Sequence, residues 1–167
     1  NALVLLNQNL TKVLNNGADL EARQNMLIGS LLAGQAFANA PVGAVHALAY
    51  PLGGHFHLSH GHSNALVLVE VLKFNVPKAK QYYAELMQLL DPRSTGCVDG
   101  LCDLFIDHMQ NHLQQSGLTL KLKDLDIAEA KLPQLAKDAM LQTRLLQNNP
   151  REMTEQDALQ IYQAIYA

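Results

Sequence analysis

The sequence predicts an all-α fold, a multi-helix bundle that forms a single helical domain over residues 1–167. Apolar residues recur at helical spacing along most of the chain, and only residues 65–74 are rich enough in β-branched side chains to suggest a strand. That stretch also places Leu68, Val71 and Leu72 at helical spacing, and no partner strand is evident elsewhere. The chain is 49% hydrophobic and 16% charged, a composition typical of a folded protein with one core.

Two helices are expected in the first quarter of the chain. Leu3 and Leu6 share one face of the first helix, which should end near residues 15–17. Asp19 is placed to cap the second helix, expected over residues 20–39. Small residues recur along this second helix and would let another backbone approach closely. We therefore expect it at the centre of the bundle.

Turn signals divide the middle of the chain. A helix that contains His46 is expected to end at Pro51, and the glycine pair at 53 and 54 would then turn the chain back. Pro77 should begin a further helix, and residues 93–100 should form a loop.

Helices are also expected near the C-terminus, over residues 99–115, around residues 136–146 and over residues 154–166. Thr154 followed by Asp157 resembles a capping box with aspartate in place of glutamate. This pattern predicts a defined start for the last helix.

Charge and composition argue against several classes of function. The net charge is -3 and the basic residues are scattered, so neither nucleic acid nor an anionic membrane is expected as a partner. No apolar run reaches the roughly 18 residues that a membrane span needs, and no secretory signal is evident, so a cytoplasmic setting is expected. Cys97 and Cys102 match no redox or zinc spacing and are expected to be reduced thiols.

Residues 41–64 carry five of the seven histidines and are the candidate site. His46 and Tyr50 lie one helical turn apart, on the same face, and the predicted reversal can bring His60 back toward His46. Neutral imidazoles are common ligands of borderline divalent metals. Zinc takes about three or four protein ligands, so His46 and His60 would need partners from elsewhere. A packed core histidine is the simpler alternative for His46.

Two other histidine patterns in the sequence resemble known metal motifs. His55, His57 and His60 approximate the His-x-His-x-Asp-His loop of metallo-β-lactamase-like zinc hydrolases, but Ser59 stands where the aspartate is needed. That loop also follows a strand, which this sequence does not offer.

His108 and His112 have the i, i+4 spacing of the His-Glu-x-x-His metal motif. The residues between them include no glutamate that could act as a general base, which favours a solvated helix flank.

Short motifs occur along essentially the whole chain. They are Leu20-Glu-Ala-Arg23, Leu32-Ala-Gly-Gln-Ala-Phe-Ala-Asn-Ala40, Gly43-Ala-Val-His-Ala-Leu-Ala-Tyr-Pro-Leu-Gly-Gly54, Phe56-His57, His60-Gly61, Asn64-Ala65, Phe74-Asn75, Leu132-Pro-Gln-Leu-Ala136 and Asn149-Pro-Arg-Glu152. In their order and spacing, these motifs together resemble one enzyme family, the iron-containing (group III) alcohol dehydrogenases.

The resemblance implies a metal site that this chain holds only in part. In the family one aspartate and three histidines bind a divalent metal, Fe²⁺ or in some cases Zn²⁺, and His46 and His60 match two of these ligands. The other two lie on an earlier helix, and the glycine-rich nucleotide-binding domain is also earlier. The chain is therefore expected to be the C-terminal part of a longer enzyme, and to be inactive alone.

The resemblance also implies hydride transfer between NAD(P) and an alcohol or its aldehyde or ketone. Phe37 and Leu145 would line the substrate pocket, and Tyr50 would face the nicotinamide. The expected partners are a small alcohol or aldehyde, the missing nucleotide-binding domain and, as an option, further copies of the enzyme.

Departures from the family pattern qualify these expectations. Many members have histidine where Tyr50 stands, so a proton relay through an imidazole is not carried over, because a phenol is a poor base at neutral pH. Ser59 replaces the proline that usually precedes the second ligand. This change affects the expected geometry of the metal site but not the identity of its ligands. The alternatives are the zinc hydrolase described above and a non-catalytic helical scaffold.

Overall fold

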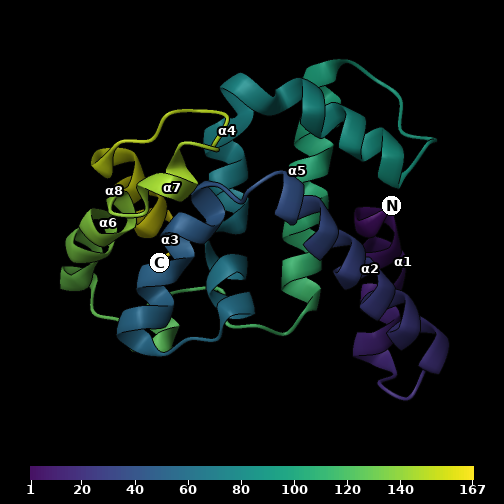
Figure 1. Ribbon diagram of the computed structural model, residues 1–167, viewed down its shortest axis with the longest axis horizontal. Helices are drawn as coiled ribbons and strands as arrows, with labels where there is room; N and C mark the ends of the chain where they lie inside the picture. Colours follow the sequence, from purple (N-terminus) through teal and green to yellow (C-terminus); the bar gives the residue numbers. More distant parts are fainter. The chain divides into compact units, whose positions relative to one another are not determined.

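The computed structural model describes all 167 residues, and every regular element in it is a helix (Figure 1). This confirms the all-α prediction. The chain falls into two compact units, one of Asn1–Pro41 with Lys80–Ser116 and the other of Val42–Ala79 with Gly117–Ala167. The division lies inside one helix, shortly after Pro77.

The first unit contains α1 (Ala2–Asn15), α2 (Leu20–Asn39), the C-terminal part of α4 (His60–Leu90) and α5 (Val98–Gln115). The predicted cap of α2 is confirmed, because the Asp19 side chain accepts a hydrogen bond of 2.9 Å from the backbone N–H of Ala22. The loop before α5 ends earlier than predicted, at Cys97, which caps α5.

The central position predicted for α2 is wrong. This helix buries only Ala22 and Gly29, whereas Leu27 is 73% exposed. Gly29 does meet a neighbouring helix, since a Cβ added there would lie 2.9 Å from the Leu6 side chain of α1. Small residues thus permit close packing against α1, but they do not determine how many helices surround α2.

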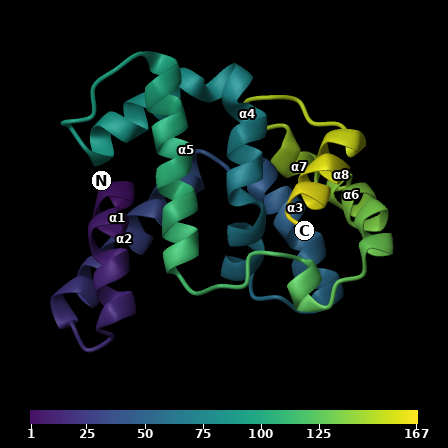
Figure 2. The ribbon, with the colours of Figure 1, turned by 180° about the vertical axis from the view of Figure 1, so that it is seen from behind.

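The second unit contains α3 (Ala44–Phe56), the N-terminal part of α4, two short 3-10 helices (Lys123–Leu125 and Glu129–Lys131), α6 (Leu132–Met140), α7 (Thr143–Leu146) and α8 (Glu155–Ala164). Figures 1 and 2 show α6 beside both α3 and α8, and α7 packs on α3 as well. The core of this unit is apolar, and its largest fully buried side chains are Leu48, Leu52, Val67, Val71, Leu122, Ile127, Leu132, Leu135 and Tyr162.

Both proline predictions in the middle of the chain are wrong. Pro51 lies inside α3 and Pro77 inside α4, and the glycine pair at 53 and 54 is helical. A helix-internal proline loses one hydrogen bond and costs about 3 kcal/mol. Pro51 and the next residue, Leu52, are buried in the core, and this packing offsets the cost.

The C-terminal helices follow the prediction in part. The helix predicted around residues 136–146 begins earlier, at Leu132, and is interrupted before α7. The capping box of α8 is confirmed, because the Thr154 N–H donates to Asp157 Oδ2 at 2.8 Å and the Asp157 N–H donates to Thr154 Oγ1 at 3.2 Å. No single helix is long and apolar enough to cross a membrane, and only α2 and α3 together, as a bent pair, have the required length and composition.

Candidate metal centre

His46 and His60 face each other across a sharp reversal of the chain. His46 is the third residue of α3 and His60 is the first residue of α4. The reversal occurs at His57, which adopts left-handed backbone angles (φ 56°) and whose N–H donates to the Gly53 carbonyl at 3.0 Å. The two imidazole centroids lie 5.1 Å apart. The predicted approach of these rings is present, although the turn is not the predicted glycine turn.

The surroundings of His46 favour its neutral imidazole form. Partial burial, followed by the nearby His60 ring, lowers the pKa of His46. One turn along α4, Asn64 Nδ2 lies 3.0 Å from His60 Nε2 and donates to it when that nitrogen is unprotonated. A lone pair that accepts from an amide is also the kind of donor that a divalent metal binds. Asn64 was missed as a site residue, although its i, i+4 spacing from His60 was a usable signal.

Tyr50 joins the two histidines as a third ring. Its centroid lies 6.4 Å from that of His46 and 6.3 Å from that of His60, and its side chain is exposed. The helical spacing thus places it where predicted, on the His46 face of α3. Its role toward a nicotinamide is not tested by this geometry.

Two of the other three histidines of residues 41–64, His55 and His62, have partners elsewhere. His55 Nε2 lies 2.6 Å from Asp138 Oδ2, and His62 Nε2 lies 2.6 Å from the Thr119 carbonyl. No group of three or more His, Cys, Asp or Glu side chains in the chain is arranged to hold a metal ion. Within this chain, His46 and His60 are therefore a pair of rings that neither His55 nor His57 joins.

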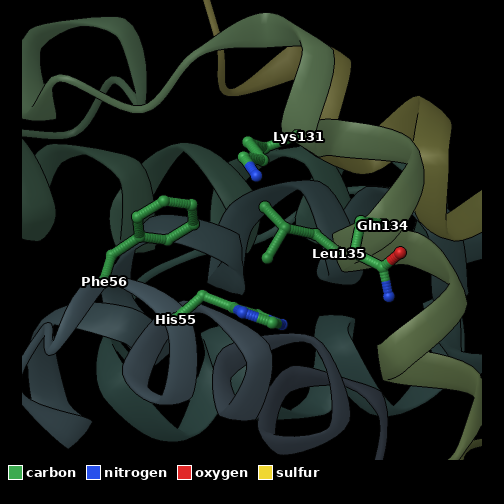
Figure 3. Close-up of a pocket in the computed structure, with 5 residues that line it drawn as sticks. All are labelled: His55, Phe56, Lys131, Gln134 and Leu135. Atoms are coloured by element: carbon green, nitrogen blue, oxygen red, sulfur yellow. The ribbon is translucent and has the colours of Figure 1, made fainter.

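A small cavity of ≈ 190 Å³ lies beside His55 (Figure 3). His55 and Phe56 from α3 face Gln134 and Leu135 from α6 across it, with Lys131 at one side. Neither His46 nor His60 lines this cavity, so it is separate from the candidate metal centre.

The two predicted pocket residues belong to different units. Leu145, on α7, is partly buried and packs against the core of the second unit. Phe37, on α2, is 58% exposed and belongs to the first unit. A substrate pocket that contains both residues remains a prediction.

Two of the family-like motifs, Phe74-Asn75 and Asn149-Pro-Arg-Glu152, are far apart in sequence but contact each other in the second unit. Asn75 and Asn149 exchange amide hydrogen bonds of 3.1 and 2.7 Å. The Arg151 guanidinium donates to the Phe74 carbonyl at 2.8 Å and lies 4.0 Å from the centroid of the Phe74 ring. The Ala44 N–H also points at Asn149 Oδ1, at 3.4 Å. These contacts fix the first turn of α3, which carries His46.

Known proteins match this chain over nearly its whole length. The family model "Fe-containing alcohol dehydrogenase family, C-terminal" matches residues 1–166. Long-chain-alcohol dehydrogenase 1 of Geobacillus thermodenitrificans (strain NG80-2) is 37% identical over 167 residues, which are 99% of this chain and 42% of that protein. The 1,3-propanediol dehydrogenase of Klebsiella pneumoniae is 32% identical over 166 residues, 99% of this chain and 43% of that protein.

Solved structures also match this chain over nearly its whole length. The crystal structure of a 1,3-propanediol oxidoreductase superposes with a TM-score of 0.94 and 32% sequence identity, covering 99% of this chain and 43% of that one. An alcohol dehydrogenase from Oenococcus oeni superposes with a TM-score of 0.91 and 30% identity over the same shares of the two chains. The chain thus spans less than half the length of the proteins that it matches.

Proposed function

Because the family model covers 1–166, the chain belongs to the Fe-containing alcohol dehydrogenase family. We propose that it is the metal-carrying domain of an NAD(P)-dependent dehydrogenase that interconverts alcohols with aldehydes or ketones. The observation that carries this proposal is the 5.1 Å separation of the His46 and His60 rings. The zinc hydrolase alternative is wrong, because the chain belongs to another family and contains no strand for the hydrolase loop to follow.

The residues present fit half of a divalent metal site. His46 and His60 would supply two neutral imidazole ligands to Fe²⁺ or Zn²⁺, and the remaining ligands would come from sequence that this chain does not contain. When bound, the metal would supply Lewis-acid polarisation of the substrate oxygen. Asn64 would hold the His60 ring in place before metal binding and would give up Nε2 to a metal that binds that nitrogen.

The other proposed roles concern the substrate and the cofactor. Tyr50 would present its exposed ring to the nicotinamide and exclude water beside it. Phe37 and Leu145 would shape the pocket for a small alcohol or aldehyde. On its own, the chain would be a non-catalytic scaffold that carries half of a metal site. Turnover would need the nucleotide-binding domain and, where the enzyme forms an assembly, further copies of the enzyme.

A zinc titration tests the paired ligands directly. During addition of Zn²⁺, we expect the side-chain ¹⁵N resonances of His46 and His60 to shift together, with low affinity because half of the ligands are lacking. His60→Ala should abolish the response of His46. The matched control is His57→Asn, since asparagine tolerates left-handed backbone angles and His57 is exposed. A His46 ring that still responds in the His60→Ala chain would refute the shared site.

A cofactor-binding measurement tests the proposal that the nucleotide-binding domain, and not this chain, holds NAD(P). We expect isothermal calorimetry of the chain with NAD⁺ to show no binding stronger than about millimolar, because no glycine-rich phosphate-binding element is present. A dissociation constant in the micromolar range would contradict the proposal that the absent domain holds the cofactor.

A further inference from the structure

Three polar side-chain atoms converge between α1 and α5 in the first unit. His108 Nε2 lies 2.5 Å and His112 Nε2 lies 2.7 Å from the same atom, Asn7 Oδ1. The two Nε2 atoms are 3.1 Å from each other, and the imidazole planes are perpendicular. All three side chains are half-buried, so the predicted solvated flank is wrong for this pair of histidines.

Hydrogen bonds alone do not satisfy all three contacts. Asn7 Oδ1 only accepts, so each imidazole must carry a proton on Nε2 in order to bond to it. The 3.1 Å contact between the two Nε2 atoms would then set one N–H against another. If Nε2 of one ring is unprotonated, it can accept a hydrogen bond from the Nε2–H of the other ring. Its own lone pair then faces the lone pairs of Asn7 Oδ1, which is repulsive. If the amide is turned so that Nδ2 donates to both rings, the two Nε2 lone pairs face each other.

A cation resolves the conflict. With the ring protons on Nδ1, two Nε2 lone pairs and one amide oxygen lie within 3.1 Å of one another, and a positive ion among them attracts all three. Histidines at i and i+4 of a helix are a known bidentate arrangement, and imidazole nitrogen suits borderline divalent metals.

We propose that His108, His112 and Asn7 form a second divalent metal site, which binds Zn²⁺ or a similar borderline metal through three protein ligands and keeps a position open for water. The site is independent of the proposed dehydrogenase function, because it uses other residues in the other unit. It joins α1 to α5, and one turn further along Thr11 Oγ1 donates to Gln115 Oε1 at 3.4 Å between the same two helices. A bound ion would therefore stabilise the first unit by mass action.

The test uses zinc chloride and a chain in which the other histidine pair is removed. In the 167-residue chain carrying His46→Asn and His60→Asn, calorimetry should detect about one equivalent of Zn²⁺. Adding His112→Gln should weaken binding by at least about tenfold, since even outer partners of metal ligands contribute factors of 10 to 100. Adding His57→Asn instead should leave the affinity unchanged. Circular dichroism identifies any variant that fails to fold.

Two substitutions of Asn7 keep the proposal falsifiable if His112→Gln does not fold. Asn7→Asp retains an oxygen ligand and adds negative charge, so zinc affinity should rise by about tenfold or more. Asn7→Leu should lower it. Zinc uptake below about a tenth of an equivalent in the parent chain, or equal affinity in the Asp and Leu variants, would overturn the proposal.

Discussion

Replacing Tyr162 by alanine is expected to destabilise the second unit by about 3–5 kcal/mol, as large aromatic truncations in a core do. Tyr162 is fully buried on α8 and is among the largest side chains that are completely enclosed. Natural domains are stable by only about 5–15 kcal/mol, so this single change should leave the second unit at the edge of unfolding. Urea denaturation followed by circular dichroism measures the loss.

Tyr162→Phe separates the hydroxyl from the ring. The Tyr162 hydroxyl donates to the Leu48 carbonyl at 2.6 Å, and burial raises the pKa of the phenol, so it remains a donor at any ordinary pH. Removing the hydroxyl should cost about 1–3 kcal/mol, because the Leu48 carbonyl is buried among apolar side chains and then has no replacement donor for this bond. Leu48 lies between His46 and Tyr50 on α3, so the His46 resonances should shift as well.

The matched control for the hydroxyl is Tyr82→Phe. Tyr82 is 65% exposed, and the same deletion there should change stability by less than about 0.5 kcal/mol. An unchanged urea midpoint for Tyr162→Phe would contradict the argument that its buried hydrogen bond holds α3.

The parts of the fold that depend on neighbouring residues could be predicted from the sequence. The cap at Asp19 and the box formed by Thr154 and Asp157 use contacts over three residues, and both are present as predicted. The helical spacing of Leu68, Val71 and Leu72 likewise outweighed their β propensity. Short-range hydrogen bonds and side-chain spacing are properties of the local sequence, so no knowledge of the tertiary structure was needed.

The predictions that failed concern positions where packing overrides local preference. Proline usually ends a helix, yet α3 continues through Pro51 because that ring and its neighbour Leu52 are enclosed by the core. The reversal consequently moves to His57, and histidine is one of the few residues other than glycine that are enriched at left-handed angles. His46 and His60 still lie close together, because α3 and the short turn after it bring the two rings toward each other.

Contacts between distant segments could not be predicted from spacing at all. The partner of His108 and His112 is Asn7, about a hundred residues earlier in the chain. Nothing in the helical pattern of α5 indicates that a carboxamide from α1 would lie between the two rings. Asn149 is a similar case, since its contacts with Asn75 and with the Ala44 N–H exist only in the folded chain and follow from no spacing in the sequence.

Replacing Asn149 by alanine is expected to destabilise the second unit by on the order of 3 kcal/mol. Asn75 is 4% exposed and exchanges both of its amide hydrogen bonds with Asn149. The substitution leaves one buried donor and one buried acceptor of Asn75 without partners, at about 1–3 kcal/mol each. It also removes the bond from Asn149 Nδ2 to the Arg151 carbonyl.

The neighbouring asparagine supplies a matched control. Asn148 donates to the Val42 and Arg144 carbonyls, but it is exposed, so Asn148→Ala should cost less than about 1 kcal/mol. The double variant Asn75→Leu with Asn149→Leu should recover part of the stability lost in Asn149→Ala, because the buried amide of Asn75 is then no longer left unpaired, while the Ala44 N–H and the Arg151 carbonyl lose their bonds to residue 149 in both variants. Urea midpoints of the three variants make the comparison.

The Asn149 network also has a consequence for the candidate metal centre. The Ala44 N–H points at Asn149 Oδ1, and Ala44 lies two residues before His46, so the network holds the first turn of the helix that presents this imidazole. We expect Asn149→Ala to weaken the joint zinc response of His46 and His60 at temperatures where the variant is still folded, while Asn148→Ala leaves it intact. A folded Asn149→Ala chain with an unaltered zinc response would show that α3 is positioned by its apolar face alone, and that the amide pair contributes only to stability.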